Sequence, residues 1–398
     1  MADTCDILIS GGGIAGLTAA AAFASSGFSV ICTDPAPPVT ERDAAGSDLR
    51  TTAFLQPAQA LLERCAIWPR LADHATPLQI MRIVDAGGTR PEPRVVKDFN
   101  AADISGQPFG WNLPNWLLRR ELIARLDGMS NVDLRFGTGT TGLFTRTDSA
   151  RVTLSDGSQV TAKLVVACDG RTSPMREAAG IPVKTTRYGQ KALAFAVTHT
   201  VPHENVSTEI HRSGGPFTLV PLPDHLGQPS SAIVWMERGP RAQELLNLEP
   251  AAFEAAMTDR SCGLFGDLKL ASRRTIWPII SQSAERLNGE RLALMAEAAH
   301  VVPPIGAQGL NMSLGDLRSL LELAAARPEG LGDAQMLAAY HKARHNEILL
   351  RVKGIDLLNR TSMLAPRPLR DLRAFGLNAL YSLAPVRKTL MQMGLGVK

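Results

Sequence analysis

The sequence of 398 residues lacks any apolar run of the roughly 18–20 residues that a membrane-spanning helix needs. It is also poor in cysteine and aromatic residues, with five cysteines and 5% aromatics. The cysteines are scattered, odd in number and without metal-ligand spacing, which excludes a disulfide framework and a zinc site and favours reduced thiols in a cytoplasm. With 45% hydrophobic and 20% charged residues, the composition is that of a globular protein.

Positive charge is concentrated at the C-terminal end. Residues 351–398 hold nine Lys or Arg and two acids, a balance of +7, whereas the rest of the chain carries −3. Basic patches interleaved with aromatic residues are missing, so nucleic acid is not expected as a partner. The basic segment is either a solvated helical surface or a docking surface for an anionic membrane or a partner protein, and the sequence leaves both readings open.

The first 33 residues have the pattern of a strand, a helix and a second strand. We expect strands at Cys5–Ser10 and Phe28–Thr33, with a helix at Ile14–Ser26 between them. The apolar stretch from Ile14 resembles a signal-peptide core, but it has no basic flank and follows glycines suited to a strand-to-helix turn. A βαβ unit is therefore predicted.

The later chain alternates between two textures. Helical spacing is found at Thr52–Cys65, Trp116–Leu126, Gly306–Ala326 and Ala334–Leu358, whereas residues 183–283 read as antiparallel sheet with two short helices. The tail beyond Leu364 is expected to be helical and broken by prolines, namely Pro366, Pro368 and Pro385. The prediction is an α/β fold whose first domain is discontinuous and interrupted by a sheet-rich domain.

The turn after the first expected strand carries a G-x-G-x-x-G pattern at Gly11, Gly13 and Gly16. The first glycine permits the tight turn, the second lets a pyrophosphate approach the backbone, and the third lets helix and strand pack closely. The helix start at Ile14 and Ala15 presents free N–H groups to the phosphates. Asp34 ends the second strand, where its carboxylate can accept hydrogen bonds from a ribose.

Two further segments extend this nucleotide signal. One is a buried strand that ends in Asp169-Gly170. The other is the stretch 296–311, in which a strand delivers Glu297, a turn containing Pro303 and Pro304 follows, and a glycine-rich helix start comes next. The amides near that start can stabilise negative charge on a reduced flavin ring, and they belong to Gly309, Leu310 and Asn311.

With these three segments the chain resembles the single-component flavoprotein aromatic hydroxylases typified by para-hydroxybenzoate hydroxylase, and more closely the ubiquinone-biosynthesis hydroxylase family. The resemblance runs from about Cys5 to about Leu390. It is strengthened by five shorter motifs, Arg50–Leu55, Tyr188–Ala192, Gly215–Leu222, Val234-Trp235 and Leu357–Arg360.

The resemblance implies a role for each matching residue. The glycine turn would hold the FAD pyrophosphate and Asp34 the adenosine ribose. Arg50 matches an arginine near the FAD, and Asn115 a polar position that reaches the flavin. Asp169 belongs to a motif associated with both FAD and the nicotinamide cofactor.

The third segment departs from the family pattern, because Ala296-Glu297 replaces the usual Gly-Asp. The family aspartate bonds the ribityl chain, and glutamate keeps the carboxylate with about 1.5 Å of added reach. We expect the backbone at Ala296 to have no need of a positive φ.

The implied reaction is ring hydroxylation of a polyprenyl phenol or quinol, using O₂ and NADPH or NADH, through a flavin hydroperoxide and without a metal. The electron donor would bind without a dinucleotide domain of its own. A hydroxylase of a small soluble aromatic compound and a non-catalytic flavoprotein subunit of a quinone-biosynthesis complex remain alternatives.

No catalytic base can be identified. Pro304 and Tyr188 are candidates for the flavin face or the substrate side, although a packing role for Tyr188 and a structural role for His300 are favoured. The oligomeric state stays open. The expected location is cytoplasmic, with peripheral contact at the inner face of the membrane.

The resemblance also divides the chain. Residues 1–75, 100–182 and 284–363 would form the Rossmann-like FAD-binding domain. Residues 76–99 and 183–283 would form the substrate-binding domain, and residues 364–398 the basic helical segment.

Overall fold

The computed structural model describes residues 3–212, 214–364 and 366–395. Its first sheet has eight strands in the order β18-β19-β11-β1-β2-β8, with β10 and β9 continuing beside β11. These strands are β1 (Asp3–Ser10), β2 (Val30–Asp34), β8 (Val132–Phe136), β9 (Thr140–Thr145), β10 (Ala150–Leu154), β11 (Gln159–Ala167), β18 (Asn288–Gly289) and β19 (Leu292–Leu294).

The centre of this sheet is parallel, since β1 pairs with both β2 and β11 in that sense. Ile7, Leu8 and Ile9 are fully buried in succession, as expected of a parallel strand covered on both faces. Helix α1 (Ile14–Ser25) joins β1 to β2, and its alanines allow close packing against β1 and against α3 (Asn115–Leu126). The predicted βαβ unit is confirmed.

The second sheet has nine strands, most of them antiparallel, in the order β20-β17-β12-β15-β14-β13-β5-β6, with β16 beside β12. The strands are β5 (Ile80–Asp85), β6 (Val95–Asn100), β12 (Val183–Thr198), β13 (Val206–His211), β14 (Pro216–His225), β15 (Gln228–Arg238), β16 (Lys269–Leu270), β17 (Thr275–Ala284) and β20 (His300–Val301). Helices α5 (Gly239–Asn247) and α6 (Pro250–Arg260) cover it over a core that contains Phe195, Phe217 and Phe253.

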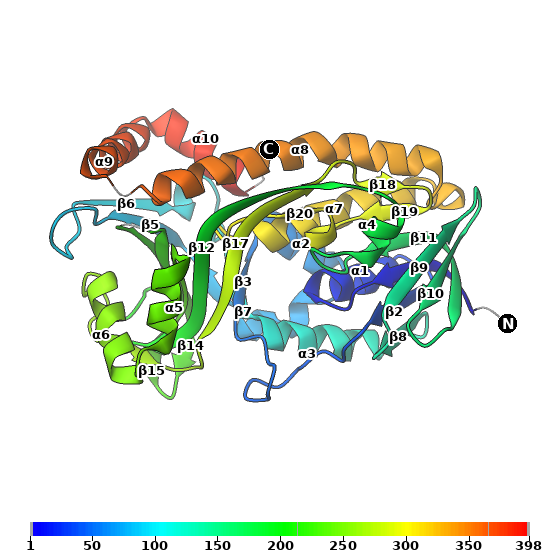
Figure 1. Ribbon diagram of the computed structural model, residues 1–398, viewed down its shortest axis with the longest axis horizontal. Helices are drawn as coiled ribbons and strands as arrows, with labels where there is room; N and C mark the ends of the chain where they lie inside the picture. The colour runs from blue at the N-terminus through cyan, green and yellow to red at the C-terminus, as the bar shows by residue number, and fades with distance from the viewer. Residues whose placement is uncertain (1–2, 213, 365, 396–398) are drawn as a thin grey trace.

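Figure 1 shows the long strands β12 and β17 running from this second sheet toward the first. A small third sheet, with β7 (Gly110–Pro114) between β3 (Thr51–Leu55) and β4 (Thr76–Leu78), contacts the second sheet through β14. The mixed α/β architecture predicted from the sequence is confirmed.

One predicted element was wrong. Residues 52–65 were expected to form a single helix, but residues 51–55 form β3 and only Gln56–Arg64 form α2. The β3 backbone pairs with β7, and Pro57 occupies the first turn of α2, where a missing N–H costs nothing. The helical spacing of apolar residues therefore extends past the start of α2 into strand β3.

Apart from the short α4, which the sequence prediction did not include, the remaining helices follow the predictions closely. They are α4 (Pro174–Ala178), α7 (Gln308–Ala326), α8 (Ala334–Ser362), α9 (Arg367–Ser382) and α10 (Ala384–Leu395), with 3₁₀ turns at Trp68–Arg70, Ala72–His74, Ala101–Asp103, Ala296–Ala298 and Pro328–Gly330. Pro368 and Pro385 do not interrupt the tail helices, because each lies in the first turn of one, where proline is tolerated. Among the described residues, no helix is long and apolar enough to span a membrane.

A second G-x-G-x-x-G match, which the sequence prediction overlooked, lies at Gly137, Gly139 and Gly142. It joins β8 to β9, and no helix follows it. Without a helix N-terminus it lacks the free N–H groups and the helix dipole that a phosphate-binding glycine turn needs.

Helix α8 ties the second sheet to the rest of the molecule. Its Asn359 donates a hydrogen bond to Gln190 of β12 (2.9 Å), and Gln190 donates to the Gly214 carbonyl (2.7 Å), both in buried surroundings. Tyr188 of β12 donates to Asp356 of α8 at 2.6 Å. The Asn359–Gln190 bond joins two of the short motifs that the sequence singled out, Tyr188–Ala192 and Leu357–Arg360, and gives both a structural reason.

Candidate cofactor-binding site

The three glycines of the first turn are required for different reasons. A Cβ at Gly11 (φ +105°) would lie 2.4 Å from the Cys168 carbonyl oxygen, and one at Gly16 would lie 1.8 Å from that of Gly11. A Cβ at Gly13 would meet nothing within 4 Å. The protein therefore fills the space around Gly11 and Gly16, and the space over Gly13 is open.

That open space lies over the N-terminus of α1. No side chain caps this end, so the N–H groups of its first turn are available to a ligand. Unfilled space, free donors and the positive end of the helix dipole fit the pyrophosphate of a dinucleotide such as FAD.

Asp34 lies at the carboxyl end of β2, beside the glycine turn. It accepts hydrogen bonds from the N–H groups of Gly12 (2.7 Å) and Ala36 (3.0 Å). These bonds hold the carboxylate at the carboxyl end of β2, next to the glycine turn, which is the position that a ribose-binding acid needs.

Asp169 follows β11 at the same edge of the sheet. It accepts hydrogen bonds from the Ser10 hydroxyl (3.0 Å) and the Met175 N–H (3.2 Å), while its Oδ1 atom is buried without a hydrogen-bond partner. Burial raises the pKa of this carboxyl, and its hydrogen bonds offset that rise only in part. An incompletely satisfied carboxylate is suited to receive a further donor from a ligand.

Arg50 and Asn115 meet at Asp48, a residue that the sequence analysis did not select. Arg50 bonds Asp48 through two nitrogens (2.8 and 2.7 Å), and the Asn115 amide donates to it at 3.0 Å. Burial would raise the pKa of Asp48, but the bonds from Arg50 and Asn115 lower it. The sequence feature that could have predicted this role for Asp48 is its position two residues before Arg50.

The same group extends toward the third segment. The Arg50 guanidinium lies 5.5 Å from the ring centroid of Trp277, and the Asp48 hydrogen bond and the negative charge of Glu297 raise the pKa of Arg50 against burial. Glu297 itself is exposed, in the 3₁₀ turn Ala296–Ala298. The structure thus links Arg50 to the buried Asn115 through Asp48 and brings it within electrostatic range of Glu297.

The expectation for Ala296 was wrong. Its φ is +56°, in the left-handed region that glycine occupies at little cost. Ala307, directly before α7, has φ +55°. Two alanines in the third segment therefore hold a conformation that disfavours a Cβ.

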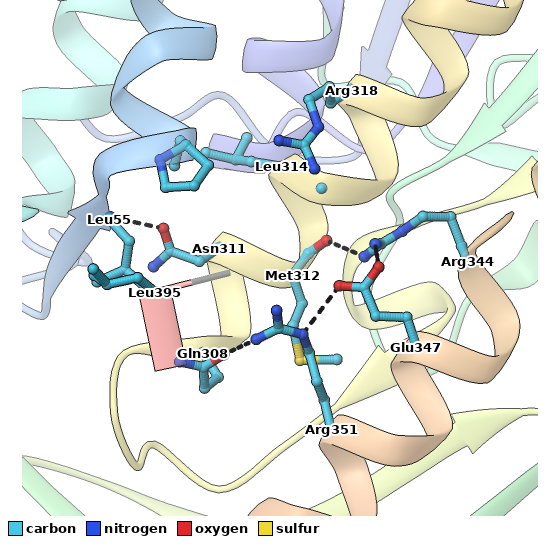
Figure 2. A pocket seen from close by; sticks show the side chains of 13 residues that line it. Leu55, Gln308, Asn311, Met312, Leu314, Arg318, Arg344, Glu347, Arg351 and Leu395 are labelled. Carbon is cyan, nitrogen blue, oxygen red and sulfur yellow. Dashed lines mark hydrogen bonds and ion pairs between the residues drawn. The ribbon is translucent and has the colours of Figure 1, made fainter. Parts of the chain in front are cut away.

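Asn311 bridges α7 and β3. Its amide donates to the carbonyls of Ala53 (2.7 Å) and Ala307 (2.6 Å) and accepts from the Leu55 N–H (2.9 Å). Figure 2 shows this residue beside a small cavity, with Gln308 of the same helix start bonded to Arg351 of α8 (2.8 Å). No side chain caps the start of α7, so the N–H groups of its first turn, which holds Gly309 and Leu310, are available to a ligand.

The remaining candidates have different surroundings. The Tyr188 hydroxyl is committed to Asp356, and burial together with that bond raises its pKa to about 12, so it is protonated at neutral pH. His300 is buried and bonded to the equally buried Asp316 at 2.6 Å, which gives it a structural partner. Pro304 is half-buried on the turn before Ala307.

Comparisons with known proteins identify the family of the chain. Residues 4–350 match the family model described as an FAD binding domain. The chain is 34% identical over 394 residues to the ubiquinone hydroxylase UbiL of Rhodospirillum rubrum, covering 98% of this chain and 89% of that protein. It is 25% identical over 395 residues to the 3-demethoxyubiquinol 3-hydroxylase of Escherichia coli, covering 98% of both.

Among solved structures, p-nitrophenol 4-monooxygenase PnpA of Pseudomonas putida has the same fold, with a TM-score of 0.80 and 17% identity over 100% of this chain and 99% of that one. The glycine turn, the acids at the strand ends and the similarity along nearly the whole length lead to one assignment. The chain belongs to the FAD-binding monooxygenase family that includes the ubiquinone hydroxylases.

Proposed function

We propose that this protein hydroxylates the aromatic ring of a polyprenylated ubiquinone precursor, with bound FAD, O₂ and NADPH or NADH. The observation that carries the proposal is the open space over Gly13 at an uncapped helix start, beside Asp34 and Asp169, in a chain 34% identical to a ubiquinone hydroxylase. A bound FAD would supply the oxygen-transfer chemistry, which needs no metal.

The chain's own residues would bind and orient the cofactor. Gly11, Gly13 and the helix start at Ile14, Ala15 and Gly16 would hold the pyrophosphate, and Asp34 the ribose. Arg50, Asn115 and Glu297 would contact the flavin end, and the amides of Gly309 and Leu310 would stabilise negative charge on the ring. Asn311 would set the position of that helix start, and Asp169 would offer its unpaired oxygen to a ligand donor.

The division of labour between domains is also part of the proposal. Residues 1–75, 100–182 and 284–363 would bind FAD, while residues 76–99 and 183–283 would cover the substrate. The supporting observation is that β5, β6 and β12–β17 share the second sheet, while β1, β2 and β11 form the centre of the first. The Pro303–Pro304 turn would form part of the wall between them, keeping water from the reacting ring.

The test is the quinone content of a deletion strain, measured by mass spectrometry. Loss of the gene should cause a precursor lacking one ring oxygen to accumulate, and the wild-type gene should restore the mature quinone. An unchanged quinone profile would contradict the proposal and favour a small soluble aromatic substrate. Restoration by a variant that binds no FAD would instead favour a non-catalytic subunit.

We further infer that the protein meets its lipophilic substrate at the inner membrane surface, through the C-terminal segment. Nine of the fourteen exposed large apolar side chains among the described residues lie between Leu350 and Met393, and among the most exposed are Leu350, Leu357, Phe375 and Met393. The segment 351–398 also carries a charge of +7. Exposed apolar side chains on a basic helical surface are typical of peripheral binding to anionic lipid.

A further inference from the structure

The small cavity of Figure 2, with a volume of about 40 Å³, lies where β3, α2, α7, α8 and α10 meet. Its apolar wall consists of Leu55, Pro57, Ala58, Met312, Leu314 and Leu395. The cavity opens to solvent, because Glu347 of α8 lines it and is exposed. Its volume exceeds the roughly 10–15 Å³ that one water needs and is far below the roughly 150 Å³ of a cavity that holds benzene. It therefore has room for a small polar group and none for an aromatic ring.

Three arginines line the cavity, and two of them have acidic partners. Arg344 bonds the buried Asp316 (2.9 Å) and also Glu347, and Arg351 bonds Glu347 through its Nε atom (3.1 Å). Arg318 of α7 has no acidic partner and no hydrogen bond within the part of the chain that the structure describes. Because Asp316 and Glu347 offset the charges of the other two, one positive charge remains, on a guanidinium with five unused N–H donors.

The other two arginines are held in fixed positions beside that guanidinium. Arg344 is buried, and its Nη2 atom lies so near α7 that a Cβ at Gly315 would come within 2.9 Å of it. Arg351 donates from Nη1 to Gln308 (2.8 Å), and its Nη2 atom makes no bond among the described residues. The cavity thus offers the whole guanidinium of Arg318 and one nitrogen of Arg351 to a ligand. Such a set of donors suits the several oxygens of a phosphate.

Exposed apolar side chains adjoin the cavity on two helices. Leu350, next to Arg351 on α8, is 66% exposed, and Met393, two residues before Leu395 on α10, is 58% exposed. Both belong to the C-terminal surface proposed above for membrane contact. A phosphate ion dissolved in water would gain nothing from these two side chains, whereas the acyl chains of a phospholipid would bury them.

We propose that this cavity binds the phosphate group of an anionic phospholipid, whose acyl chains lie against Leu350 and Met393. The inference deepens the proposed function, since it rests on the docking of the C-terminal segment at a membrane. It adds a defined site to a contact otherwise made by diffuse charge, and Arg318 supplies the uncompensated charge of that site. Because Arg351 also bonds Gln308, the headgroup lies beside the start of the helix proposed to face the flavin.

The first test is calorimetric titration of the FAD-loaded protein with dihexanoyl phosphatidic acid, a short-chain lipid that stays dissolved below its micelle concentration. Loss of a charge-assisted contact weakens binding by about tenfold or more, so R318A should raise the Kd by about that factor. The matched control is K353A, because Lys353 is an exposed cation two residues after Arg351 on α8 and does not line the cavity. K353A should retain the wild-type Kd, and both variants should retain FAD and the wild-type melting temperature. Equal Kd values for R318A and wild type would overturn the inference. So would inorganic phosphate that binds as tightly as the lipid, because the cavity would then serve a free anion.

The second test is sedimentation with vesicles of phosphatidylcholine that contain phosphatidic acid. R318A should reduce retention more than K353A, although each substitution removes one positive charge, and equal reductions would overturn the inference in favour of diffuse electrostatic docking. If the vesicles retain the wild-type protein but it does not bind the short-chain lipid, the site is wrong while membrane docking stands. If the vesicles do not retain the wild-type protein, the proposed docking fails as well. The quinone profile of the deletion strain tests the hydroxylase function independently of both results.

Discussion

At position 13, glycine is needed to leave space for the ligand and is not needed by the fold. Its φ of −70° is available to any residue, and a Cβ there meets no protein atom. We predict that G13V folds with the melting temperature of the FAD-free wild-type protein but does not bind FAD, because the valine occupies the space over the helix start. The measurement is the ratio of flavin to protein absorbance after gel filtration. A full complement of FAD in G13V would place the pyrophosphate elsewhere.

Ala296 is strained by its own Cβ. A left-handed φ costs a non-glycine residue about 1–2 kcal/mol, part of which the greater freedom of unfolded glycine offsets. We predict that A296G raises the free energy of unfolding by about 1 kcal/mol in urea titrations. The control is A298G in the same 3₁₀ turn, where φ is not positive and glycine should destabilise. Equal effects of the two substitutions would contradict a local strain at Ala296.

Substitutions at Glu297 test whether a glutamate can make the cofactor contact for which the family uses an aspartate. E297A should lose a charge-assisted hydrogen bond to the cofactor and weaken FAD binding by about 1.5–3 kcal/mol, whereas E297D keeps the carboxylate and should bind comparably. FAD dissociation constants can be measured by fluorescence titration of the apoprotein. Equal constants for wild type and E297A would remove Glu297 from the site.

At the scale of elements, α7 and α8 are joined by a buried carboxylate. Asp316 of α7 bonds His300 (2.6 Å) and the Arg344 side chain of α8 (2.9 Å), and all three are buried. Burial alone would raise the pKa of Asp316, but His300 and Arg344 outweigh it and lower that pKa. The ionised form is therefore the one that the fold stabilises.

We predict that D316N lowers the free energy of unfolding by about 3–5 kcal/mol at pH 7, because it leaves buried donors without their charge partner. Since folding lowers the pKa of Asp316, its stabilisation is present above an unfolded pKa of about 3.9 and is lost as pH falls further. The difference in the free energy of unfolding between wild type and D316N, measured by urea titration, should thus become smaller below pH 4. D259N, which removes an exposed partner of Arg212, should cost less than about 1 kcal/mol. A difference in the free energy of unfolding that is the same at every pH would contradict the conclusion that the ionised Asp316 stabilises the fold.

At the scale of the whole molecule, the tail that we propose for membrane docking also packs against the rest of the protein. Met391 and Leu395 of α10 are buried with Leu55 and Phe109, while Val386, Leu390 and Met393 face outward. Gln308, at the start of α7, donates a hydrogen bond to the Gly394 carbonyl at 3.1 Å. The helix that we propose for membrane contact thus touches the segment proposed to face the flavin.

We predict that liposomes with anionic lipid retain the protein at low salt and release it near 0.5 M, where the Debye length falls below about 5 Å. Neutralising Arg367, Arg370 and Arg373 together should weaken retention in a sedimentation assay and leave FAD content intact. The side chains of Arg367 and Arg373 lie outside the described residues, so this prediction rests on the charge of the segment. Retention that ignores both salt and the substitutions would rule out electrostatic docking, but not the hydroxylase assignment.

The sequence by itself determined the features that depend on local order along the chain. The βαβ start, the glycine turn and α3 follow from periodicity and from residues whose backbone needs are local, and the match to a family follows from motif order. The boundary inside residues 52–65 did not, because pairing of β3 with β7 overrode a helical pattern.

Only the tertiary structure decided which distant residues meet. Asp48 joined Arg50 and Asn115, Tyr188 was committed to Asp356 of α8, and Arg318 and Arg351 came to line one cavity. It also showed that Ala296 takes a positive φ, which the packing of a whole turn imposes. Such outcomes depend on contacts between residues tens to hundreds of positions apart, and spacing along the chain carries no record of them.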